Sequence, residues 1–99
     1  MAAKASKPPA KLSAEQVAQR VAAMPQWAEV AGSIQRTFQF KDFVEAMKFV
    51  NRVADVAEKA QHHPDILIRW NKVTLSLNTH DAGGITQKDF DLAGQIDRM

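Results

Sequence analysis

The stretch that decides the fold runs from Asp42 to Leu77 and reads DFVEAMKFVNRVADVAEKAQHHPDILIRWNKVTLSL. Its first half predicts an amphipathic helix that ends near Ala60, because apolar residues recur there at spacings of three and four. The apolar stripe consists of Phe43, Met47, Val50, Ala54 and Ala57. Asp42, three residues before Glu45, is a typical residue for the N-cap of such a helix.

The second half of this stretch predicts a β-hairpin. Ile66–Trp70 and Val73–Leu77 are short runs rich in apolar and β-branched residues, as strands are. Asn71-Lys72 between them has the length of a tight hairpin turn. Residues two apart in a strand point to the same face of the sheet, so Trp70 shares a face with Ile68, and we expect its side chain in the core.

Upstream of this stretch the sequence predicts a helix and then extended chain. Ser13 and Gln16 match a capping box, and the helix that they begin ends before Pro25. Trp27 opens a short extended segment. Ile34–Phe40 alternates apolar and polar side chains, which predicts a half-buried strand.

Downstream the sequence predicts a loop at residues 79–84 and a last helix that Thr86 caps, with Asp89 at the third helical position. The buried side of this helix is expected to hold Phe90, Ala93 and Ile96. The order is therefore helix, strand, strand, helix, strand, strand, helix. Strands joined by short turns pair antiparallel, and helices covering one sheet face make a two-layer α+β domain.

The charge distribution separates a tail from a folded body. Of the thirteen Lys and Arg residues, Lys4, Lys7 and Lys11 lie at the N-terminus with no acidic residue among them. The remaining chain contains the other ten basic residues and all eleven acidic residues, so it is nearly neutral. We therefore expect residues 1–11 to be a disordered basic tail and residues 12–99 to be a single domain. A nucleic-acid-binding domain would carry its basic excess on a folded face, so direct nucleic-acid binding is not expected.

Composition excludes several classes of protein. The chain has no cysteine, so it has no disulfide, no thiolate nucleophile and no thiolate zinc site. No segment is apolar enough to span a membrane, and the N-terminus lacks the apolar run of a secretory signal. These features favour a cytoplasmic protein. Gly83-Gly84 lacks the spacing of a phosphate-binding loop, and neither Ser33 nor Ser76 lies in a nucleophile elbow.

The three histidines are the candidates for chemistry. His62 and His63 follow the end of the long helix, where Pro64 turns the chain, and His80 follows the second hairpin strand. Because a hairpin returns the chain to its starting level, the three imidazoles should converge at one rim of the sheet. Imidazole titrates near neutrality, which suits proton transfer. Three histidines can also bind zinc, although adjacent side chains diverge in regular structure.

A larger pattern carries a family resemblance. It consists of Phe40-Lys41-Asp42-Phe43, Glu58-Lys59-x-x-His62-His63-Pro64-Asp65, Trp70-Asn71-Lys72-Val73, Thr79-His80 and Asp89. This pattern resembles the pterin-4a-carbinolamine dehydratase family over about residues 27–93. The resemblance implies a two-layer α+β fold with a four-stranded antiparallel sheet and three helices packed on one face. It implies dehydration of 4a-hydroxytetrahydrobiopterin to quinonoid dihydrobiopterin, which recycles the pterin of aromatic amino-acid hydroxylases and requires no cofactor or metal.

The resemblance also implies roles for individual residues. His62, His63 and His80 would line the pterin site, with His63 and His80 transferring protons and His62 orienting the ring. Supporting or binding residues would be Glu58, Gln61, Pro64, Thr79, Asp89 and Trp27. We expect Glu58 to orient an imidazole and Asp89 to support His80 or cap its helix. Relatives often carry an acidic residue where this chain has Gln61.

Two other functions remain open. Members of this family can serve as dimerisation cofactors of a transcription factor, and distant relatives act as assembly factors. The resemblance therefore implies a homodimer or a homotetramer, and a protein partner such as a transcription factor or a hydroxylase. The Asp42–Ala60 helix would provide the interaction surface. The other alternative is a metal-binding protein built on the three histidines.

Overall fold

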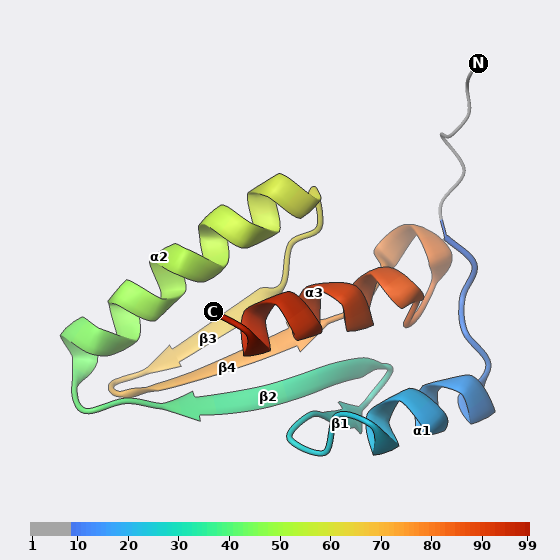
Figure 1. The fold of residues 1–99 in the computed structure, drawn as a ribbon, viewed down its shortest axis with the longest axis horizontal. Helices are drawn as coiled ribbons and strands as arrows, with labels where there is room; N and C mark the ends of the chain where they lie inside the picture. The colour runs from blue at the N-terminus through green and yellow to red at the C-terminus, as the bar shows by residue number, and fades with distance from the viewer. Residues whose placement is uncertain (1–8) are drawn as a thin grey trace.

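A computed structural model of the chain describes residues 9–99, and Lys4 and Lys7 of the expected tail lie outside the described residues. Its elements are α1 (Ala14–Ala22), β1 (Ala28–Val30), β2 (Ser33–Gln39), α2 (Phe43–Ala60), β3 (Asp65–Arg69), β4 (Lys72–Leu77), the short 3₁₀ helix η2 (His80–Ala82) and α3 (Gln87–Asp97). Figure 1 shows them in space. Within residues 9–99, no helix combines the length and the apolar character needed to cross a membrane.

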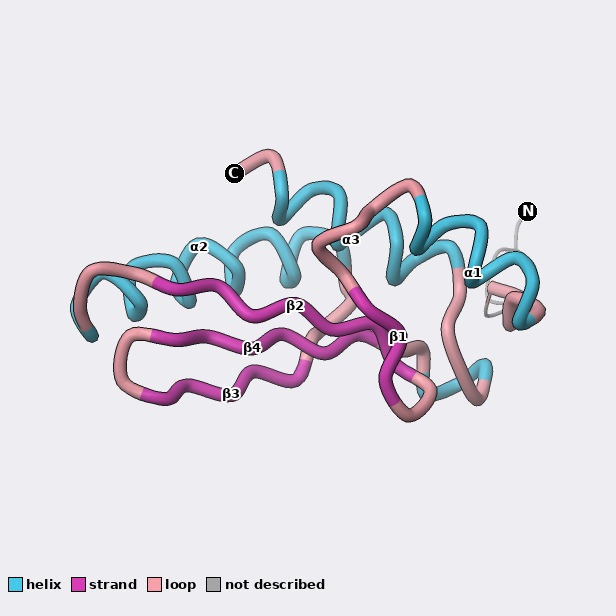
Figure 2. The backbone as a smooth tube through the Cα atoms, turned by 90° about the horizontal axis from the view of Figure 1, so that it is seen from below, coloured by secondary structure: helices cyan, strands magenta, loops and turns pink. Residues whose placement is uncertain are grey.

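The four strands form one antiparallel sheet in the order β1-β2-β4-β3. Figure 2 shows the three α-helices on one side of this sheet and, among residues 9–99, no helix over the central strands on the other. The predicted α+β class and element order are therefore confirmed. The covered face carries the core, which includes Trp27, Ile34, Val53, Leu75 and Leu77.

The helices α1 and α2 begin directly after Ser13 and Asp42, the residues predicted to cap them. The Ser13 hydroxyl accepts a hydrogen bond from the Gln16 backbone, and the Gln16 side chain accepts one from the Ser13 backbone. Asp42 accepts from the backbone N–H of Glu45 at 2.9 Å. Each cap satisfies backbone donors that a helix start leaves without partners, so short polar side chains fix where these helices begin.

The residues predicted for the buried face of α2 were the wrong ones, with one exception. The buried residues are Ala46, Phe49, Val53 and Ala57, so only Ala57 is shared with the expected set. Phe43 is 48% exposed. The reason is aromatic packing, because Phe49 contacts Phe38 in β2 and Phe40 just after β2, at ring-centroid distances of 4.6 and 4.9 Å. These contacts rotate the helix away from the face that periodicity alone suggested.

The hairpin turn lies one residue earlier than expected. Arg69 pairs with Lys72, so Trp70 and Asn71 form the turn. Asn71 anchors it, because its side-chain amide donates to the Phe40 carbonyl and its own carbonyl accepts from the Phe40 N–H. Trp70 adopts a left-handed backbone with φ of 53° and is 67% exposed, so the expectation that it lies in the core is wrong.

Candidate active site

One wall of the site is the end of α2. Gln61 takes the left-handed conformation that terminates the helix, with φ of 52°, and its side-chain amide donates to the carbonyl of Glu58 at 2.7 Å. The backbone N–H of His62 donates to Ala57, which closes the last turn. The chain then turns so that His62 is buried and His63 is exposed. The two adjacent imidazoles therefore point into different environments.

The opposite wall is the loop that follows β4. Asp65 pairs with Ser76, so the start of β3 lies beside the end of β4. Thr79 pairs with Gly84 across the loop, and the short helix η2 between them begins with His80. The hairpin thus returns the chain to the end of α2, as the sequence predicted. His80 arrives beside the turn that carries His62 and His63.

The residues of these two walls enclose a polar pocket of about 320 Å³. It is lined by Gln61, His62, His63, Asp65, Asn78, Thr79, His80, Asp81 and Lys88. All three histidines of the chain lie on this one cavity, so the predicted convergence is confirmed. A pocket with this lining can exchange protons with a polar ligand and can bind both its donors and its acceptors.

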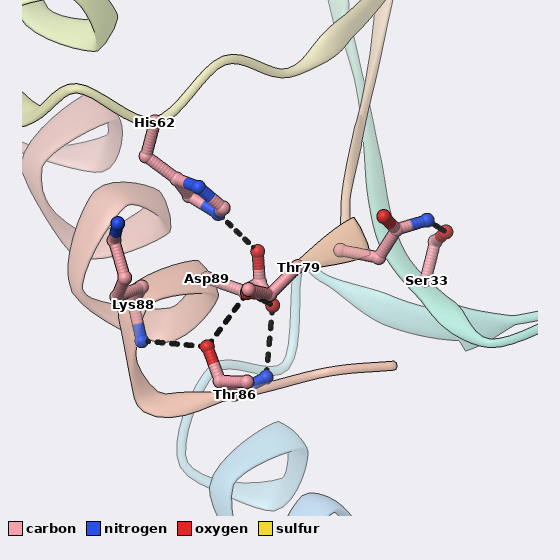
Figure 3. Close-up of polar contacts among 7 residues, drawn as sticks. Ser33, His62, Thr79, Thr86, Lys88 and Asp89 are labelled. Carbon is pink, nitrogen blue, oxygen red and sulfur yellow. Dashed lines mark hydrogen bonds and ion pairs between the residues drawn. The ribbon is translucent and has the colours of Figure 1, made fainter. Parts of the chain in front are cut away.

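His62 is held by a buried polar cluster, drawn in Figure 3. Its Nε2 lies 2.5 Å from an Asp89 carboxylate oxygen. The other oxygen of this fully buried carboxylate accepts from the Thr79 hydroxyl at 3.0 Å and from the Thr86 backbone N–H at 2.9 Å. The two threonine hydroxyls lie 2.7 Å apart. Asp89 therefore fixes one imidazole while it caps α3.

His63 is held by a second carboxylate. Its Nε2 lies 2.8 Å from a carboxylate oxygen of Glu58, one turn back in α2. Both side chains are largely exposed, at 62% and 72%. A carboxylate that accepts from Nε2–H leaves Nδ1 with its lone pair, so this contact selects the tautomer of the neutral ring. Two of the three imidazoles thus have their own carboxylate.

Of the other predicted site residues, some line the pocket and some do not. Asp89 pairs with His62, and the prediction that it supports His80 is wrong, although the predicted cap of α3 is confirmed. Gln61 and Thr79 line the pocket, whereas Pro64 is only half-buried in the turn beside it. Trp27 lies in the core, 1% exposed, and its indole donates to the carboxylate of Asp97 at 2.9 Å. Trp27 is therefore not part of the pocket lining.

Four residues that line the pocket were not among the predicted site residues, namely Asp65, Asn78, Asp81 and Lys88, although Asp65 is part of the family pattern. Each directly neighbours a residue that was selected, and this adjacency was the available signal. Asn78 donates to the hydroxyl of Ser33 at 2.9 Å and so ties the end of β4 to β2. Within residues 9–99, no group of three His, Asp or Glu side chains is arranged to hold a metal ion.

Fold and pocket together define an α+β protein with a histidine-rich pocket equipped for proton transfer. The sequence model of the family described as "Pterin 4 alpha carbinolamine dehydratase" matches residues 10–99. A protein of Picosynechococcus sp. named "Putative pterin-4-alpha-carbinolamine dehydratase" is 52% identical over 90% of this chain and 97% of its own length. The chain therefore belongs to the pterin-4a-carbinolamine dehydratase family.

Two solved structures share this fold, and the first also agrees with the family assignment. The crystal structure of a transcriptional coactivator/pterin dehydratase from Brucella melitensis superposes with a TM-score of 0.84 at 32% identity, covering 89% of this chain and 96% of that one. A pterin dehydratase-like protein identified as a RuBisCO assembly factor in the alpha-carboxysome has a TM-score of 0.59 at 18% identity, over 73% and 83% of the two chains. The second likeness concerns the fold alone.

Proposed function

We propose that this protein dehydrates 4a-hydroxytetrahydrobiopterin to quinonoid dihydrobiopterin and water, and so recycles the pterin of aromatic amino-acid hydroxylases. The observation that carries the proposal is that His62, His63 and His80 line one and the same polar pocket. Membership of the family supplies the class of substrate. A protein with only an interaction role has no physical need for three imidazoles around one cavity.

The reaction requires two proton transfers and no change in oxidation state. The bond between C4a and the hydroxyl oxygen breaks, and the hydroxyl leaves as water after it accepts a proton. The proton on the neighbouring ring nitrogen, N5, is removed, and its electron pair forms the new double bond to C4a. An acid and a base on different sides of the pterin complete the step, and groups positioned in this way contribute about 10²–10⁴-fold.

Within the proposal, His63 is the base and His80 is the acid. Glu58 accepts a hydrogen bond from Nε2–H of His63, so the lone pair of Nδ1 is available for the proton on N5. His80 lies across the pocket at the start of η2 and is exposed, so it can reach the departing hydroxyl. The two rings come from different elements, which suits action at two separate atoms.

His62 orients the ring in this scheme. Its side chain is 10% exposed and its Nε2 is engaged by Asp89, which is fully buried. An imidazole fixed in this way has one defined orientation and one remaining nitrogen, so it is a rigid contact for a flat ligand. Gln61, whose amide nitrogen is engaged by the backbone of Glu58, keeps its side-chain oxygen as a further acceptor.

The substitution His63→Ala tests these assignments. We expect kcat/KM for dehydration to fall by at least about tenfold, because the base is lost. The exposed imidazole contributes little packing, so the circular dichroism spectrum and the unfolding midpoint should not change. Lys59→Ala, at an exposed position of the same helix end, is the control and should keep full activity. Unchanged turnover in His63→Ala would exclude His63 as the base.

We also propose that the protein self-associates as a dimer or a dimer of dimers. Phe43, Val44 and Trp70 are 48%, 60% and 67% exposed. Phe43 and Val44 begin α2, and the hydrogen bonds between Phe40 and Asn71 hold this end of α2 next to the turn that carries Trp70. Figure 1 shows the two segments at the same end of the molecule. Exposed apolar residues grouped in this way are typical of protein interfaces.

A further inference from the structure

Lys88 is a pocket residue that the proposed function does not use. It is the second residue of α3, directly before Asp89, and its side chain is half-buried. It lines the histidine pocket and also a neighbouring cavity of about 240 Å³, and His62 is the other residue common to both. Figure 3 shows the Lys88 side chain on the same side of Asp89 as the His62 ring. Lys88 therefore lies at the boundary between the two cavities, beside His62.

The position of Lys88 has no evident structural benefit. A cation in the first turn of a helix faces the positive end of the helix dipole, which is unfavourable. Within residues 9–99, no salt bridge includes Lys88. Asp91, the acidic residue one turn further along α3, accepts instead from the side chain of Gln87 at 2.9 Å. A half-buried ammonium without a carboxylate partner is suited to bind a ligand.

We propose that the Lys88 ammonium binds the 4-oxo group of the pterin and so selects oxo-pterins over their 4-amino analogues. An ammonium only donates hydrogen bonds, and the ring carbonyl is the strongest acceptor of a pterin. The ring N–H and amino groups need acceptors, which Asp65 and Asp81 provide in the same pocket. This inference rests on the proposed function, because it takes a pterin as the ligand.

The chemistry determines which kinetic constant Lys88 affects. The carbonyl is present before, during and after dehydration, so a bond to it forms equally in the ground state and in the transition state. Loss of the hydroxyl leaves positive charge near C4a and N5, which an ammonium does not stabilise. Lys88 is therefore a positioning and specificity residue, and its loss should raise KM without lowering kcat.

The test compares the binding of two ligands by the wild type and by Lys88 variants. The dissociation constants of 7,8-dihydrobiopterin, which carries the 4-oxo group, and of its 4-amino analogue are measured by titration calorimetry with the wild type and with Lys88→Met. We expect the wild type to favour the oxo ligand about tenfold, as one charge-assisted hydrogen bond allows, and Lys88→Met to lose this preference. KM should rise about tenfold in Lys88→Met at constant kcat, and Lys88→Arg should restore most of the preference.

Lys48→Met is the matched control, because Lys48 is 61% exposed on α2 and pairs with Glu45. It should bind both ligands as the wild type does. The melting temperature of Lys88→Met should stay the same or rise, because the cation at the helix start is removed. An oxo preference that survives in Lys88→Met overturns this inference and leaves the proposed function intact. A wild type that binds neither pterin overturns both.

Discussion

Asp89 is the residue on which the buried part of the site depends. It is fully buried and accepts hydrogen bonds from His62, Thr79 and the backbone of Thr86, so one carboxylate joins the end of α2, the end of β4 and the start of α3. A carboxylate buried in this way is tolerated because its oxygens have partners. The same bonds that fix an imidazole therefore also hold three elements together.

Because of this dual role, Asp89 should contribute to folding stability as well as to function. Asp89→Ala removes the carboxylate that accepts from His62, Thr79 and the Thr86 backbone, so we expect the free energy of unfolding to fall by about 3 kcal/mol or more. Asp91→Ala, at an exposed position of the same helix, should change it by less than about 0.5 kcal/mol. Urea unfolding followed by circular dichroism measures both variants. A change below about 1 kcal/mol in Asp89→Ala would contradict the structural role.

The sequence predicted much of the site at this scale. The convergence of His62, His63 and His80 followed from hairpin topology and did not need the correct turn residues. The partner of Asp89 was not predictable in this way, because it depends on how α3 crosses the end of α2. Capping patterns are local in sequence, whereas the contact between His62 and Asp89 spans 27 positions. Local chemistry was therefore predicted better than the pairing of charges across elements.

At the scale of elements, the two errors have one origin. Periodicity reports that one face of an element is apolar, but α2 carries two adjacent apolar stripes, and only contact with Phe38 and Phe40 decides which one is buried. In the hairpin, a shift of one residue moved Trp70 from the expected core to an exposed turn. Alternation alone does not fix register when both candidate turns have two residues.

The strained turn yields a prediction for the hairpin. Trp70 has a left-handed backbone and a largely exposed side chain, so Trp70→Gly should raise the free energy of unfolding by about 0.5–1 kcal/mol. Asn71→Ala is the opposite control, because it removes the bond to the Phe40 carbonyl and should lower stability by about 1 kcal/mol. Both are measured by urea unfolding at low protein concentration. A less stable Trp70→Gly would show that Trp70 makes contacts outside its own chain.

At the scale of the whole molecule, self-association is the open property. A monomer has a mass of 11.0 kDa, and we expect sedimentation equilibrium to give two or four times this value. Phe43→Asp should shift the protein toward the monomer, because it places a charge on the exposed apolar end of α2. Aspartate at a helix start is favourable, so the monomer should stay folded. Lys41→Asp, a neighbouring exposed charge change, is the control. A wild type that is monomeric at all concentrations would contradict the proposal.

Catalysis in the histidine pocket is the central property that we propose for the whole molecule, and a direct assay tests it. Purified protein is mixed with 4a-hydroxytetrahydrobiopterin, and formation of the quinonoid dihydropterin is followed by absorbance against the uncatalysed rate without protein. We predict turnover that is proportional to protein concentration and that His80→Ala reduces by at least about tenfold. A wild type that does not exceed the uncatalysed rate would contradict the account.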